Sequence, residues 1–129
     1  MEAASTVKGD RIWLIAPDWQ VRALVRAQLL EEGYDVTAVE DWDSLQALLQ
    51  EEEVVAPRLV IAELTGAEPP AALALLRTLP ARRLVLRAAG APDAAALRAA
   101  GIDAVLSRPY DIGAIVRAVR SLLGEPTRR

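Results

Sequence analysis

Five short apolar runs alternate with five segments of helical periodicity, and this alternation constrains the fold more than any other feature of the chain. The runs, which we predict to be strands, cover residues 11–16, 34–39, 59–64, 84–86 and 102–106. Strands that alternate with helices are typical of a parallel sheet covered by helices on both faces. The sequence therefore predicts an α/β protein with one parallel sheet of five strands.

Residues that favour a helix start stand before each helical segment. Asp18 and Asp41 are predicted N-caps, and Pro69 with Pro70 opens a short helix that ends near Thr78. Pro92 and Asp93 open the next helix, and the last one follows Pro109 and runs from Asp111 to Leu123. In the first helix we expect the face toward the sheet to consist of Val21, Leu24, Val25 and Leu29.

The chain has 129 residues, which fits one domain with one core. We expect a domain over residues 11–124 with tails at residues 1–10 and 125–129. No cysteine or histidine is present, which removes zinc sites, thiol nucleophiles and imidazole catalysis from consideration. The formal net charge is −3 and the arginines are spread along the chain, so the sequence shows no basic cluster that would bind nucleic acid. No segment offers a membrane span or a signal-peptide core, so we expect a cytoplasmic protein.

In an open parallel sheet, ligands bind at the carboxyl ends of the strands. The residues that we expect at this edge follow the first, third, fourth and fifth runs: Ala16, Pro17, Asp18, Glu63, Arg87, Arg108 and Pro109. No glycine-rich phosphate loop follows the first run, which disfavours a nucleotide-binding site.

Four pieces of the chain, RIWLIAPDWQVR, EEGYDVTAVED, PRLVIAEL and AGIDAVLSRPYD, carry a family resemblance by their order and spacing. From about Arg11 to Leu123 the chain resembles a response-regulator receiver domain of two-component signal transduction. The resemblance implies the flavodoxin-like (βα)5 fold, with strand order 2-1-3-4-5.

The resemblance also implies which positions would carry the phosphorylation chemistry of a receiver. Such domains use an acidic pair for Mg²⁺, an aspartate as phosphoryl acceptor, a Ser or Thr, and a Lys before a Pro. In this chain those roles fall, in order, on Ala16 and Pro17, Glu63, Arg87, Arg108 and Pro109. Only the proline is retained, so the resemblance identifies a degenerate member, a pseudo-receiver.

These departures have chemical consequences. Mg²⁺ needs carboxylate oxygens, and Asp18 alone is displaced from the expected pair, so we expect neither a cofactor nor catalysis. The longer Glu63 side chain would hold a permanent carboxylate near where the phosphoryl oxygens would lie. We expect it to pair with Arg108, Arg87 or both, because arginine binds carboxylates through two nitrogens. The alternative is that both arginines point into solvent.

The leading hypothesis is a phosphorylation-independent protein-interaction module that is not an enzyme. One alternative is a small-anion sensor that uses the two arginines, and another is an unusual phosphoacceptor. The expected partner is a signalling protein, or a second copy bound through the fourth helix, fifth strand and fifth helix. That face would present Arg98, Asp103, Arg117 and Arg120.

The three tryptophans are the remaining features. Trp13 lies inside the first run and is expected in the core. Trp19 and Trp42 lie at helix starts. Each of them either packs against the adjacent loop or forms part of a contact surface.

Overall fold

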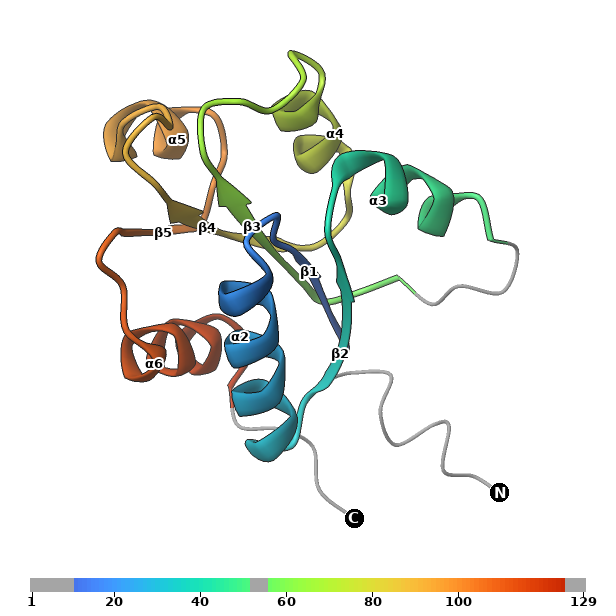
Figure 1. Cartoon of the computed structure of the whole chain (residues 1–129), viewed down its shortest axis with the longest axis vertical. Coiled ribbons are helices and arrows are strands. Elements are labelled where there is room, and N and C mark those ends of the chain that lie inside the picture. The colour runs from blue at the N-terminus through green and yellow to red at the C-terminus, as the bar shows by residue number, and fades with distance from the viewer. Residues whose placement is uncertain (1–10, 52–55, 125–129) are drawn as a thin grey trace.

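The computed structural model describes residues 11–51 and 56–124, and its strands form one parallel sheet in the order β2-β1-β3-β4-β5 (Figure 1). The strands are β1 Arg11–Ile15, β2 Asp35–Val39, β3 Leu59–Leu64, β4 Arg82–Arg87 and β5 Ala104–Ser107. The helices are α2 Trp19–Glu31, α3 Trp42–Leu49, α4 Ala72–Thr78, α5 Ala94–Ala99 and α6 Ile112–Leu123. The predicted fold class and strand order are confirmed, whereas the predicted tails lie outside the described residues.

Helices cover both faces of the sheet, as Figure 1 shows. On one face α2 and α6 pack against one set of alternate strand residues, and on the other face α3, α4 and α5 pack against the remaining set. The two sets alternate because successive side chains of a strand point to opposite faces. Within β3, for example, Ile61 belongs to the first core and Val60 and Ala62 to the second.

Aspartates begin four of the five helices. The carboxylates of Asp18, Asp41, Asp93 and Asp111 each accept a hydrogen bond from a backbone N–H in the first turn. These bonds satisfy N–H groups that have no partner within the helix. The predicted helix starts at these four positions are therefore confirmed.

Three details of the sequence analysis are wrong. Strand β4 is longer than residues 84–86, and β5 begins two residues later than predicted. In α2, Leu24 is 61% exposed rather than buried, whereas Leu29 is fully buried. Successive residues of a helix are about 100° apart, so Leu24 lies about 140° around the axis from Leu29 and away from the sheet.

None of the helices formed by the described residues is long and apolar enough to cross a membrane.

The two leucines of α2 provide a matched test of this packing. Leu29→Ala should lower the free energy of unfolding by about 2–5 kcal/mol, because it leaves a cavity in the first core. Leu24→Ala removes the same atoms from solvent-exposed positions and should change it by no more than about 0.5 kcal/mol. Urea denaturation measures both values, and equal losses would contradict the orientation of α2.

Candidate functional site

Glu63 is the one charged residue that is buried in the part of the chain that the structure describes, with 1% of its surface exposed. It is the penultimate residue of β3, at the carboxyl edge of the sheet. The two-residue period of the strand places it on the same face as Ile61, beneath α2 and α6. A carboxyl group is therefore held where the core meets the edge of the sheet.

Groups from two separate segments contact the Glu63 carboxylate. The backbone N–H of Asp18, in the turn between β1 and α2, donates to Oε1 at 3.1 Å. The hydroxyl of Tyr110, between β5 and α6, donates to Oε2 at 3.3 Å. Nη2 of Arg108 lies 3.6 Å from Oε2. The carboxylate thus links β3 to the ends of β1 and β5.

Arg108 approaches Glu63 through a single nitrogen, so the bidentate geometry that we expected is not formed. Its Nη2 also lies 4.0 Å from Oδ2 of Asp18, and its guanidinium carbon lies 5.9 Å from the centre of the Tyr110 ring. The direct hydrogen bond to Oε2 comes from the Tyr110 hydroxyl. Half of the Arg108 side chain, 52%, is exposed, so it acts as a charge at the rim of the site.

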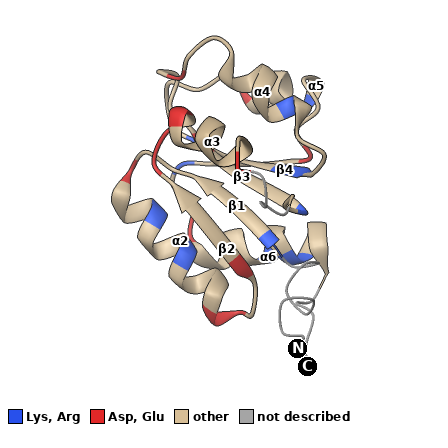
Figure 2. Ribbon diagram, turned by 90° about the vertical axis from the view of Figure 1, so that its right-hand side faces the viewer, with Lys and Arg blue, Asp and Glu red and all other residues tan. Residues whose placement is uncertain are grey.

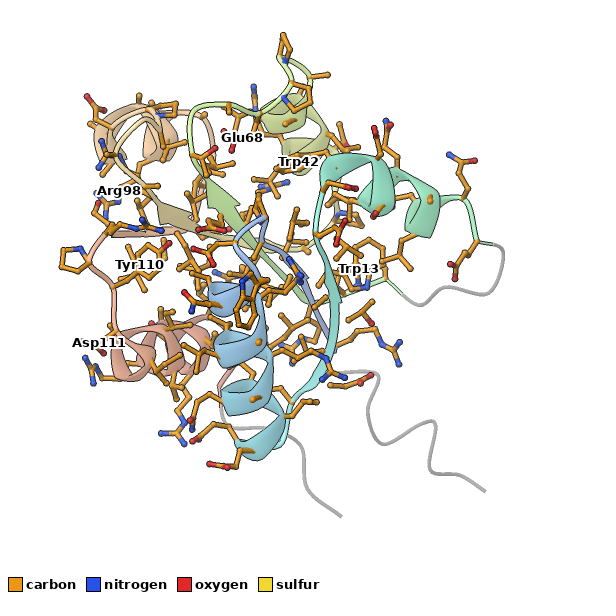
Figure 3. All side chains as sticks on the ribbon, in the orientation of Figure 1. Trp13, Trp42, Glu68, Arg98, Tyr110 and Asp111 are labelled. Atoms are coloured by element: carbon orange, nitrogen blue, oxygen red, sulfur yellow. The ribbon has the colours of Figure 1, made fainter. Side chains whose placement is uncertain are left out.

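Tyr110 is the functional residue that the sequence analysis missed. Figure 3 shows its ring between the end of β5 and α6. Burial is the main cause that raises the pKa of its phenol above the ordinary value, which keeps the hydroxyl protonated as a donor. The pKa of Arg108 is also raised, chiefly by Tyr110 and less by the charges of Glu63 and Asp18. The position of Tyr110 just after the fifth predicted strand was the available signal.

The residues after β1 do not fit a divalent cation. Ala16 is fully buried, and its carbonyl oxygen accepts a hydrogen bond of 2.7 Å from Nη1 of Arg22. Neither Ala16 nor Pro17 has a side-chain oxygen, and Asp18 uses Oδ1 to cap α2. Both oxygens of Glu63 already accept hydrogen bonds. Among the described residues, no group of three or more acidic side chains is arranged to hold a metal ion.

Arg87 points away from Glu63 and toward the connection between β4 and α5. Its Nε donates to the carbonyl oxygen of Pro92 at 2.6 Å, and Nη2 donates to that of Ala91 at 3.5 Å. Its Nη1 lies 3.4 Å from the hydroxyl of Ser107. Of the two expected partners of Glu63, only Arg108 is close to it, and Arg87 instead holds backbone carbonyl groups.

The connections that follow β3 and β4 pack against each other without room for a side chain. Gly66 has a φ of +96°, and a Cβ atom built on it would lie 2.2 Å from the carbonyl oxygen of Gly90. The backbone N–H of Ala88 donates to the carbonyl oxygen of Leu64 at 2.9 Å. These contacts join the two connections beside the site.

The four residues of the expected interaction face have different surroundings. Asp103 accepts a hydrogen bond of 2.8 Å from the backbone N–H of Arg83. Arg120 forms an ion pair with Glu32 at the end of α2, so it lies on the side of α6 that faces α2. Arg98 and Arg117 are exposed.

The three tryptophans are also placed differently. Trp13 is 1% exposed and belongs to the core, as predicted. Trp19 is 66% exposed at the start of α2. Trp42 is 8% exposed and packs into the second core, which agrees with the first of the two alternatives, packing within the domain.

Solved structures of response-regulator receiver domains resemble this chain. A response regulator receiver protein from Burkholderia phymatum is 20% identical, with a TM-score of 0.73 over 92% of this chain and 98% of that one. A CheY-like response regulator receiver domain protein from Methanospirillum hungatei JF-1 is 17% identical, with a TM-score of 0.68 over 90% of this chain and 95% of that one. Full-length FixJ from B. japonicum is 19% identical, with a TM-score of 0.72.

The match with FixJ spans 88% of this chain and 57% of the FixJ chain. No protein-family model matches the chain. No curated protein matches it. At identities of 16–22%, the structural likeness establishes the fold of the chain.

A double-mutant cycle tests whether Glu63 and Arg108 interact. Arg108→Ala should lower the denaturation midpoint, because it leaves a buried carboxylate without its cationic partner. Adding Glu63→Gln to that variant should recover part of the loss, which gives a coupling energy different from zero. A coupling energy of zero would make Arg108 a solvated residue at the rim.

Tyr110→Phe provides the matched comparison for this cycle, because it keeps the ring and removes only the donor to Oε2. We expect the Glu63–Tyr110 cycle to give a coupling of about 1 kcal/mol, which is typical of a buried hydrogen bond.

Proposed function

We propose that this chain is a receiver-like module of signal transduction that works without phosphorylation, by binding another protein. The observation that carries the proposal is the buried Glu63 carboxylate, which is held by Asp18, Tyr110 and Arg108. A permanent negative charge lies at the position that the resemblance gives to a phosphoryl acceptor. We assign no catalytic residue.

The surroundings of Glu63 support phosphorylation independence on chemical grounds. Phosphoryl transfer depends on positioning and on a metal ion that neutralises the developing charge. Ala16 and Pro17 supply no carboxylate for such an ion, and both oxygens of Glu63 are engaged. Arg108 places its own positive charge 3.6 Å from Oε2 instead.

The two adjoining connections support a single fixed state. In the proposal, Arg87 holds the carbonyl groups of Ala91 and Pro92, and Gly66 packs against Gly90. A residue that moves toward a phosphoryl group is therefore replaced by one that is anchored to the backbone. The small-anion alternative loses support, because Arg87 and Arg108 have different partners.

Exposure to acetyl phosphate and Mg²⁺ tests the proposal directly. Intact-mass spectrometry should show no added phosphoryl group, because the side chains that would bind the metal are absent. Glu63→Asp restores only the acceptor and should likewise stay unmodified. A phosphoryl adduct that appears on the native chain and disappears in Glu63→Gln would contradict the proposal.

For the partner, we propose the face formed by α5, β5 and α6, where Arg98 and Arg117 are exposed. Arg120 is better omitted from a test, because its charge already pairs with Glu32. This face would bind a second copy of the chain or a signalling protein.

A charge reversal at Arg98 and Arg117 should weaken self-association in analytical ultracentrifugation. Thermal stability should hardly change, because exposed charges contribute only about 0–1 kcal/mol. Arg26→Glu on α2 is the matched control, since that arginine is exposed on a different helix. A native chain that stays monomeric at all concentrations would contradict the homodimer.

A further inference from the structure

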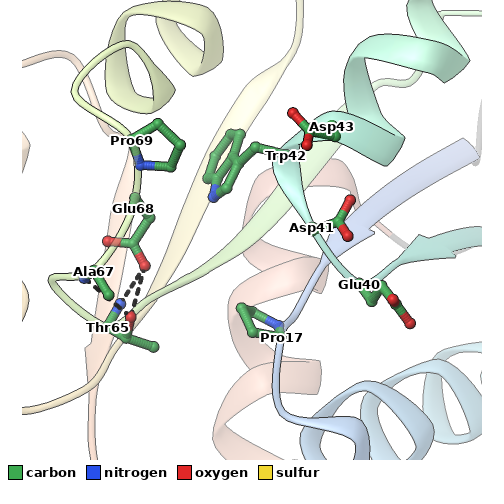
Figure 4. A pocket seen from close by; sticks show the side chains of 9 residues that line it. All are labelled: Pro17, Glu40, Asp41, Trp42, Asp43, Thr65, Ala67, Glu68 and Pro69. Carbon is green, nitrogen blue, oxygen red and sulfur yellow. Dashed lines mark hydrogen bonds between the residues drawn. The ribbon is translucent and has the colours of Figure 1, made fainter.

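A cleft of about 320 Å³ lies between the start of α3 and the segment that follows β3 (Figure 4). Four of its lining residues are acidic, namely Glu40, Asp41, Asp43 and Glu68, and no lysine or arginine lines it. Figure 2 shows acidic positions, in red, where the chain leaves β2 and enters α3. Glu63 does not line this cleft, which adjoins the site described above through Pro17.

Local structure explains only some of these acidic residues. Asp41 caps α3 by accepting from the N–H of Ser44 at 2.7 Å, and hydrogen bonding to Ser44 lowers the pKa of its carboxyl. Glu68 accepts three hydrogen bonds from Thr65 and Gly66. Within residues 11–51 and 56–124, no hydrogen bond or ion pair engages the side-chain carboxylate of Glu40 or that of Asp43. Two exposed negative charges therefore remain at the mouth of the cleft.

Trp42 gives a second and independent observation. Its side chain is 8% exposed, and its indole Nε1 is buried without a hydrogen-bond acceptor. Figure 4 shows the nitrogen end of the ring turned toward the space that the other lining residues surround. Leaving a buried N–H group unpaired is unfavourable, so the indole indicates a missing acceptor.

The two observations together restrict the chemistry of a ligand. Four carboxylates repel an anionic acceptor, so the partner of Trp42 should be a neutral oxygen such as a peptide carbonyl. The same ligand should also carry a positive charge that pairs with the carboxylates of Glu40 and Asp43. Arginine suits the site, because its planar group binds carboxylates through two nitrogens and also stacks on aromatic rings.

We propose that this cleft binds an arginine-containing segment of a partner protein. The guanidinium pairs with Glu40 and Asp43, and a backbone carbonyl oxygen of the segment accepts from Nε1 of Trp42. The assignment adds a partner chemistry to the proposed interaction function. It does not depend on whether phosphorylation changes the state of the domain.

Binding requires a local movement. The indole nitrogen is covered, and Pro69 and Glu68 lie across the cleft from the start of α3 (Figure 4). An acceptor reaches the nitrogen only when residues 65–69 shift. The backbone amides of this segment should therefore respond to the ligand together with the indole.

Titration of the ¹⁵N-labelled full chain with the peptide acetyl-Ala-Arg-Ala-amide tests the proposal. The indole N–H resonance of Trp42, identified with Trp42→Phe, should shift together with the amides of residues 65–68. Acetyl-Ala-Gln-Ala-amide has the same carbonyl groups without the charge, and spermidine has charge without a carbonyl group. Both should leave the indole resonance in place at the same concentration.

Two variants measure the contributions of the charges and the indole. Glu40→Gln with Asp43→Asn should weaken binding of the arginine peptide at least about threefold. Glu31→Gln with Glu51→Gln removes the same charge elsewhere and should not. Trp42→Phe keeps an aromatic ring without the N–H and should weaken binding about three- to tenfold.

Three results would overturn the proposal. They are equal shifts with the glutamine peptide, an indole shift caused by spermidine alone, or no indole shift up to the solubility limit of the arginine peptide. The native-chain titration decides the matter even if Trp42→Phe fails to fold, because Trp13→Phe and Trp19→Phe then identify the Trp42 indole resonance by elimination.

Discussion

The arrangement at the carboxyl edge of the sheet depends on the burial of one carboxylate. A carboxylate that is removed from water without partners costs a large free energy, so its neighbours must supply hydrogen bonds and positive charge. Glu63 is 1% exposed, and its partners come from the ends of β1 and β5. A short carbon chain at this position would not reach the same groups. The side chain of Glu63 thereby links the ends of three strands, β1, β3 and β5.

The connections after β3 and β4 are held by contacts between protein groups, whereas a phosphorylation switch relies on contacts with a phosphoryl group. Arg87 is bound to backbone carbonyl groups, and the Gly66–Gly90 approach leaves no space for a side chain. Neither contact involves a ligand, so neither needs one to form. In the proposed function, specificity comes from the exposed surfaces: the face of α5, β5 and α6, and the acidic cleft beside Trp42.

The fold could be predicted from the sequence because apolar runs that alternate with capped helices commonly form a parallel sheet with helices on both faces. The orientation of single side chains was harder to predict. Leu24 fits the apolar spacing of α2 but lies beyond its buried face, and Arg87 follows the expected strand but turns to the backbone beside it. Tyr110 was missed, because periodicity does not indicate which polar atoms meet. The unpaired nitrogen of Trp42 is visible only once the surrounding atoms are placed.

The central claim is that the buried carboxylate of Glu63 holds the connections after β1 and β5 in one state. Relaxation dispersion of backbone ¹⁵N nuclei detects exchange between states on the microsecond-to-millisecond timescale and tests this claim most directly. The claim predicts flat dispersion profiles for residues 16–20 and 107–111 in the native chain, and measurable exchange in Glu63→Gln. Exchange in both connections of the native chain, with a second populated state, would contradict it.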